Sequence, residues 1–195
     1  MVSITFPTLL TLVRLVVSPI ILPLLLVYGL PLELLWVNGT LAAIFVFFSL
    51  TDFFDGYLAR RLKQESALGK ALDPLADKFL VYSTLVALLA IHKIYFYWVV
   101  ILIGRDFFMM GLRQIALEHN FSVSVSGLGK IKTAVLLIYL TMAILNPYQG
   151  LWDEHPWWNG VETMLLAATL VLAIWSAKKY YSAFIKQFMM HVHEL

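Results

Sequence analysis

The sequence predicts an all-α membrane protein, a bundle of six transmembrane helices that forms a single domain over residues 1–195. Hydrophobic residues make up 61% of the chain, and its mean hydropathy is +0.83. Charged residues make up 13%, against about 25% in an average soluble domain. The chain also contains six apolar runs close to the roughly 20 residues that a helix needs to cross a bilayer.

Taken in order, the six predicted helices lie near residues 9–30, 35–60, 72–92, 94–117, 126–146 and 158–182. The breaks between them are short and polar, so no appended soluble domain is expected. The chain has no cysteine, which excludes disulfides and thiolate chemistry. Its net charge of +2 gives no indication of nucleic-acid binding.

The distribution of Lys and Arg predicts the orientation, because cytoplasmic loops carry an excess of both. If both termini are cytoplasmic, Lys93 alone of these cations falls on the far side, where most of the tryptophans also cluster. The other side then holds Arg60, Arg61, Lys63, Lys70, Arg113, Lys130, Lys132, Lys178, Lys179 and Lys186.

Four aspartates lie toward the predicted cytoplasmic ends of two helices: Asp52, Asp55, Asp73 and Asp77. A charge at the centre of a membrane helix costs about 2.5–3.5 kcal/mol, and neighbouring carboxylates repel one another. The spacings of three and four residues place each pair on one helix face, and the short link lets the two faces meet. A divalent cation would offset the penalty, and all-oxygen ligands suit Mg²⁺, Mn²⁺ or Ca²⁺ rather than Zn²⁺. Carboxylates with cations nearby point to phosphoryl chemistry.

Small residues and one proline accompany these carboxylates. Gly56, Ala59 and Gly69 leave room for a neighbouring backbone or a substrate to approach. The pair Asp73-Pro74 predicts the first turn of a helix, where a carboxylate and a proline are both favourable.

Residues 52–77 resemble the signature of the CDP-alcohol phosphatidyltransferase family, D-x-x-D-G-x-x-A-R-x8-G-x3-D-x3-D. All eight defined positions match at the same spacing: Asp52, Asp55, Gly56, Ala59, Arg60, Gly69, Asp73 and Asp77. The N-terminal stretch of residues 7–14 is also similar to family members, although Thr5 stands where the family usually has Asn. The family implies a six-helix membrane fold with its active site near the cytoplasmic face.

This resemblance implies a role for each aspartate. Asp52, Asp55 and Asp73 are expected to bind two divalent ions, Mg²⁺ or Mn²⁺, that hold the pyrophosphate of a CDP-linked lipid. Asp77 also faces the metal and is the expected general base. The CDP-lipid pocket is expected to include Thr11, Asp52, Gly56, Ala59, Arg60, Gly69 and Asp73.

Within the family, the chain is similar to bacterial members that transfer a phosphatidyl group from CDP-diacylglycerol to glycerol 3-phosphate. Four cations are candidates to bind the acceptor phosphate: Arg105, Arg113, Lys130 and Lys132. Arg fits phosphate oxygens bidentately, and Lys acts as a point charge. Two alternatives stay open. Arg113, Lys130 and Lys132 also fit the positive-inside pattern, and Arg105 has Asp106 or a carboxylate of the next helix as a possible ion-pair partner. The resemblance further implies a homodimer in the bacterial inner membrane.

Two other functions remain compatible with the sequence. A sibling transferase would use phosphatidylglycerol, inositol phosphate or serine as the acceptor, and basic residues favour a phosphorylated acceptor over serine. Outside this class, four aspartates in membrane helices suit a carrier of divalent cations. A carrier would move metal without releasing CMP, whereas the enzyme releases CMP only when an acceptor is present.

Overall fold

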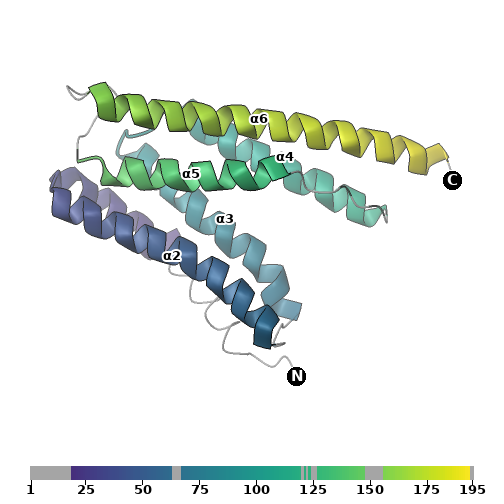
Figure 1. The fold of residues 1–195 in the computed structure, drawn as a ribbon, viewed down its shortest axis with the longest axis horizontal. Coiled ribbons are helices and arrows are strands. Elements are labelled where there is room, and N and C mark those ends of the chain that lie inside the picture. Colours follow the sequence, from purple (N-terminus) through teal and green to yellow (C-terminus); the bar gives the residue numbers. More distant parts are fainter. Residues whose placement is uncertain are drawn as a thin grey trace. The chain divides into compact units, whose positions relative to one another are not determined.

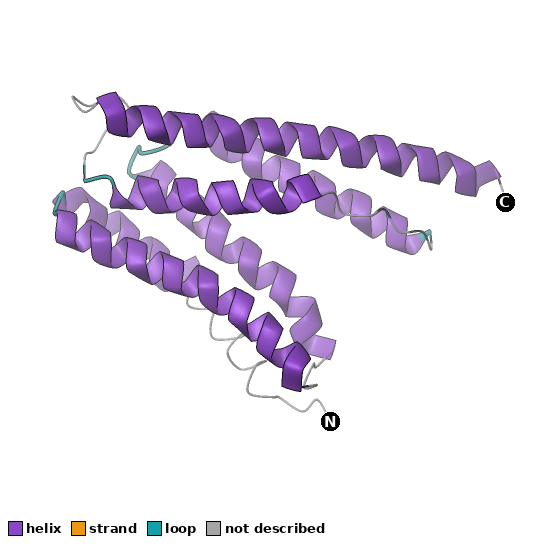
Figure 2. Ribbon diagram, viewed as in Figure 1, coloured by secondary structure: helices purple, strands orange, loops and turns teal. Residues whose placement is uncertain are grey.

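The computed structural model describes residues 19–62, 67–119, 121, 123, 127–147 and 156–193, and the side chains within these ranges except residues 51–77, 156 and 191–193. Every regular element in these ranges is a helix (Figure 2). The all-α prediction is therefore confirmed for the described part of the chain. The chain divides into two compact units, which we describe separately. The first comprises Met1–Ile94 and Leu140–Asn159, and the second Tyr95–Tyr139 and Gly160–Leu195.

The first unit is built around a helical hairpin. Residues 19–29 are helical and continue into the short 3-10 helix η1 (Leu30–Leu32), which packs against α2 (Leu35–Leu62). Figure 1 shows α2 and α3 (Ala67–Ala90) as antiparallel neighbours. Fully buried leucines and phenylalanine form the apolar core of these helices: Leu22, Leu26, Leu30, Phe45, Leu85 and Leu88.

The start of α3 differs from the sequence-based prediction. The helix begins at Ala67, so Asp73 and Pro74 lie in its interior and not in its first turn. Proline lacks an N–H group and disturbs one intrahelical hydrogen bond. Membrane helices tolerate proline because neighbouring helices and side chains satisfy the freed backbone groups. The prediction that Pro74 marks a helix start was therefore wrong.

A left-handed residue ends α3. His92 has a φ of 59°, its N–H donates to Leu89 O at 3.0 Å, and the N–H of Lys93 donates to Leu88 O at 2.9 Å. This pair of bonds is a Schellman motif, which satisfies carbonyls at the helix end. Glycine is the usual residue at the left-handed position. The motif turns the chain sharply and directs it to Lys93, which is buried.

The side chain of Lys93 caps the end of a helix whose last residues belong to the same unit. Its Nζ donates to the carbonyls of Ala143, at 3.3 Å, and Asn146, where α5 (Gly127–Leu145) ends. The buried Asn38 of α2 donates to the same Asn146 carbonyl at 2.8 Å. The last carbonyls of a helix have no intrahelical partner and favour a cation. Lys93, the one cation predicted to lie on the far side, thus ties α5 to the end of α3.

We expect Lys93→Met to destabilise the protein without changing its fold. The substitution keeps the apolar stem but leaves the carbonyls of Ala143 and Asn146 with fewer donors. The loss amounts to about 2 kcal/mol, or a fall of roughly 4–8 °C in the thermal midpoint. Thermal unfolding of detergent-solubilised protein measures this shift. Lys179→Met, at an exposed lysine of α6 (Pro156–His193), is the matched control; equal midpoints for the two variants would contradict the capping role.

The second unit contains α4 (Phe96–Glu118), most of α5 and most of α6 (Pro156–His193). One apolar cluster joins α4 to the C-terminal part of α6 and includes Leu112, Ala116, Val123, Tyr180 and Phe184. Helix α6 continues well past residue 182, which is the predicted end of this helix. Hydropathy falls there, but residues 161–195 contain no glycine or proline to stop a helix.

Polarity in the second unit is inverted relative to a soluble protein. Asp106 and Lys132 are 3% and 1% exposed, whereas Phe107 and Trp175 are 58% and 60% exposed. In the described residues, Gly127–Leu145 and Trp157–Met190 are long and apolar enough to cross a membrane. Shorter apolar helices cover Pro19–Leu32, Leu35–Leu50 and Lys78–Ala90. Exposed aromatic side chains around buried charges are typical of a protein whose solvent is lipid.

Candidate functional site

The four signature aspartates lie on the two helices of the hairpin. Asp52 and Asp55 belong to the last three turns of α2, which ends at Leu62. Asp73 and Asp77 belong to the first half of α3, which begins at Ala67. Their side chains lie outside the described residues, so their roles as metal ligands stay predictions. As a donor set, four carboxylates suit hard divalent cations.

The predicted CDP-lipid pocket also remains a prediction. Gly56, Ala59, Arg60 and Gly69 have helical backbones in α2 and α3, but their side-chain environment lies outside the described residues. Thr11 lies outside them altogether. The sequence spacing and the helix hairpin thus remain the basis for this pocket.

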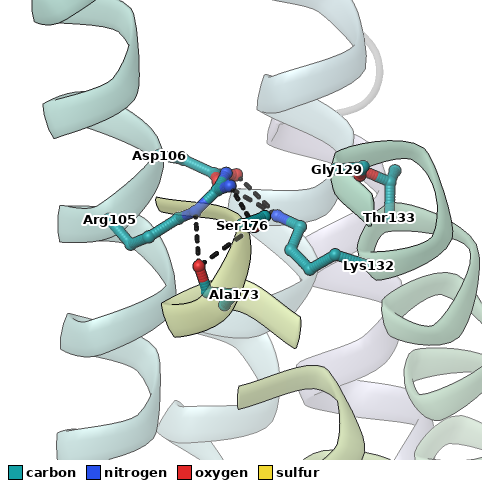
Figure 3. A network of polar contacts seen from close by, with 7 residues as sticks. All are labelled: Arg105, Asp106, Gly129, Lys132, Thr133, Ala173 and Ser176. Atoms are coloured by element: carbon teal, nitrogen blue, oxygen red, sulfur yellow. Dashed lines mark hydrogen bonds and ion pairs between the residues drawn. The ribbon is translucent and has the colours of Figure 1, made fainter. Parts of the chain in front are cut away.

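Two of the four predicted acceptor-binding cations meet in the second unit. Figure 3 shows Arg105 and Asp106 of α4, Lys132 of α5 and Ser176 of α6 pointing toward one another. Lys132 Nζ donates to both carboxylate oxygens of Asp106, at 3.0 and 3.1 Å. Arg105 Nη1 donates to Asp106 Oδ1 at 2.7 Å. One carboxylate is therefore shared by two cations.

Helix α6 holds the other nitrogens of Arg105. Nε donates to the carbonyl of Ala173 at 3.2 Å, and Nη2 donates to Ser176 Oγ at 2.6 Å. The Ser176 hydroxyl donates in turn to the Ala173 carbonyl at 3.1 Å. Each nitrogen of the guanidinium thus has one protein acceptor. Since a guanidinium has five N–H groups, one on each terminal nitrogen is left without an acceptor among the described residues.

This network is almost completely withdrawn from solvent. The side chains of Lys132 and Asp106 are 2% and 3% exposed, and that of Arg105 is 14% exposed. Removing one partner from a buried ion pair costs about 3–5 kcal/mol, because it leaves a desolvated charge. Thr133, one residue after Lys132, donates its hydroxyl back to Gly129 O at 3.1 Å. The arrangement places two cations from different helices at one buried carboxylate.

The other two predicted cations are placed differently. Arg113 of α4 and Lys130 of α5 are both exposed. Among the described residues, neither forms a hydrogen bond or ion pair with the network around Asp106. Of the four candidates, the structure therefore brings together Arg105 and Lys132.

Sequence reasoning treated Asp106 as an ion-pair partner and missed Ser176. The sequence offers one indication of Ser176, which is a hydroxyl residue within the apolar run of residues 163–177. A lone serine in a membrane helix usually bonds to its own helix backbone. Only its position opposite Arg105 distinguishes Ser176 from such residues.

Comparison with known proteins agrees with the signature. The sequence profile of CDP-alcohol phosphatidyltransferases matches residues 4–175. The chain is 36% identical, over 183 residues, to the CDP-diacylglycerol–glycerol-3-phosphate 3-phosphatidyltransferase of Salmonella choleraesuis. Its identity to the proteins of that name from Escherichia coli K12 and Shigella flexneri is also 36%. Each alignment covers 91% of this chain and 93% of the relative.

The profile match includes the signature aspartates, the cations of the network and the first half of α6. Members of this family generally use divalent metal ions. Because the match extends over most of the chain and the relatives are similar along nearly their full length, the protein belongs to the CDP-alcohol phosphatidyltransferase family.

Proposed function

We propose that this protein transfers the phosphatidyl group of CDP-diacylglycerol to glycerol 3-phosphate, giving phosphatidylglycerophosphate and CMP. The observation that carries the proposal is the 36% identity, over 91% of the chain, to relatives named for this reaction. The complete signature from Asp52 to Asp77 supports it. The enzyme would thus act in phospholipid biosynthesis.

The proposal includes a location. A single domain of six transmembrane helices would place the hairpin of α2 and α3 with its aspartates at the cytoplasmic face of a bacterial inner membrane. The excess of Lys and Arg on one predicted side supports this orientation, and the exposed apolar residues of α4 and α6 support the lipid environment. We further propose a homodimer, which is the assembly that the family resemblance implies.

In the proposed reaction, a hydroxyl of glycerol 3-phosphate attacks the lipid-linked phosphorus of CDP-diacylglycerol. Asp77 takes the proton of that hydroxyl as general base. The new oxygen–phosphorus bond forms as the bond to CMP breaks, so the phosphatidyl group changes acceptors and no redox step occurs. Asp52, Asp55 and Asp73 would hold divalent ions, with Asp77 facing them; bound ions supply positive charge for the pyrophosphate.

The acceptor phosphate would be bound by the cations of α4 and α5. Arg105 and Lys132 support this role because both converge on one carboxylate in a site shielded from solvent. A charge-assisted hydrogen bond is stronger in such an environment than in water. Arg113 and Lys130 are exposed, and we propose that they attract the anionic acceptor from solution.

A panel of acceptors tests the proposal. Purified protein in detergent or vesicles is given CDP-diacylglycerol and Mg²⁺, and CMP release is measured with glycerol 3-phosphate, phosphatidylglycerol, inositol phosphate or serine. We expect release with glycerol 3-phosphate and no release without an acceptor. Release with another acceptor alone would keep the reaction and change the substrate. Metal flux into vesicles without CMP release under any condition would instead identify a cation carrier.

A further inference from the structure

We infer that Asp106 is a positioning residue of the acceptor site, which holds Arg105 and Lys132 in place for the phosphate of the acceptor, with Ser176 as the second anchor. The inference rests on the proposed function. It goes beyond that function because neither Asp106 nor Ser176 belongs to the signature or to the predicted cations. Asp106 acts through Arg105 and Lys132, Ser176 acts through Arg105, and neither is assigned a contact with substrate.

The shared carboxylate supplies the first constraint. Arg105 and Lys132 come from different helices, and two cations brought this close together would otherwise repel each other. Oδ1 of Asp106 accepts from both cations, at 2.7 Å from Arg105 Nη1 and 3.0 Å from Lys132 Nζ. Oδ2 accepts a second bond from Lys132 at 3.1 Å. Asp106 therefore fixes the distance between the two positive charges before any ligand binds.

Ser176 and the Ala173 carbonyl supply the second constraint. They hold Nη2 and Nε of Arg105 from α6, and Asp106 of α4 holds Nη1, so the plane of the guanidinium is set by acceptors on two helices (Figure 3). The remaining N–H groups, one on each terminal nitrogen, have no acceptor among the described residues, and guanidinium donors match phosphate oxygens. Preorganised donors bind more tightly because no side-chain entropy is lost on binding.

Replacing Asp106 by Asn distinguishes a residue that positions the two cations from one that only neutralises their charge. If the carboxylate only competed with the substrate for the cations, its removal would strengthen phosphate binding. If it positions them, its removal leaves two buried cations without the anion they share. They then move apart, which dismantles the pair, so the KM for glycerol 3-phosphate rises.

The experiment measures CMP release by the full-length protein while each substrate is varied in turn. For Asp106→Asn we expect the KM for glycerol 3-phosphate to rise roughly 10–100-fold, with the KM for CDP-diacylglycerol within about twofold. Asp106→Glu keeps the charge and restores most of the loss. For Ser176→Ala we expect a rise of about fivefold. Ser182→Ala, at an exposed serine of the same helix, is the matched control.

The outcomes separate this inference from the proposed function. CMP release by the wild-type protein with glycerol 3-phosphate establishes the function before any variant is tested. An unchanged or lower KM for glycerol 3-phosphate in Asp106→Asn then overturns only the positioning role. An equal rise in both KM values overturns it as well, because that result indicates a general loss of structure. If Asp106→Asn does not fold, a Ser176→Ala protein with normal thermal midpoint and unchanged KM overturns the inference.

Discussion

Asp77→Asn is expected to lower the rate of CMP release by about 10³-fold, because a positioned general base contributes roughly 10²–10⁴-fold to such a reaction. Asparagine is isosteric with aspartate but cannot accept the proton of the attacking hydroxyl. The KM for CDP-diacylglycerol should change little, since the other signature aspartates remain. Steady-state CMP release at saturating substrates measures the effect.

The matched control for this variant is Glu118→Gln, which replaces an exposed carboxylate of α4 by its amide. It should retain the wild-type rate. Because Asp77 is also expected to face the metal, the Asp77→Asn protein must be assayed over a range of Mg²⁺ concentrations. Full recovery at high Mg²⁺ would contradict a general base and would reduce Asp77 to a metal ligand.

Removal of divalent ions is the second large effect. Chelation with EDTA should reduce CMP release to background, and added Mg²⁺ or Mn²⁺ should restore it. We expect Asp55→Asn to lower the rate about 10²-fold at low Mg²⁺ and to recover in part when Mg²⁺ is raised, because the substitution removes one ligand of a set. Titration of CMP release with each metal measures the shift.

The two aspartate variants are thus expected to respond differently to the metal titration. Asp55→Asn shifts the Mg²⁺ requirement, whereas Asp77→Asn lowers the maximal rate at every concentration. Glu118→Gln should follow the wild-type titration. Full activity in protein shown by elemental analysis to be free of divalent metal would contradict the predicted metal site.

Most helix positions were predictable because hydropathy and helix breakers are local properties. Helices α4 and α5 begin and end within two residues of the predicted ranges near 94–117 and 126–146. The errors have local causes too. Pro74 was read as a helix start although membrane helices tolerate interior proline. The end of α6 was placed at the fall in hydropathy, although helix propensity continues to His193.

The candidate site likewise has one part that local sequence predicts and another part that it does not. The signature from Asp52 to Asp77 is contiguous on two neighbouring helices, so its spacing alone indicated the chemistry of oxygen ligands and phosphoryl transfer. The partners of Arg105 and Lys132 could not be predicted in this way. Asp106 is adjacent to Arg105, but Lys132 is 26 residues from Asp106 and Ser176 is 71 residues from Arg105. Helical period says which face a residue occupies and does not say which helix covers that face.

Sequence information alone thus predicted a membrane protein, the order of its helices, its family and the aspartates that carry the proposed chemistry. These predictions depend on composition, on apolar run length and on spacing within a short segment, all of which can be read from the linear sequence. Three contacts are visible only in the folded protein: Lys93 caps α5, Arg105 and Lys132 share Asp106, and Ser176 binds the guanidinium. Such pairings depend on how helices distant in the sequence pack, because a buried charge must find its partner wherever packing places one.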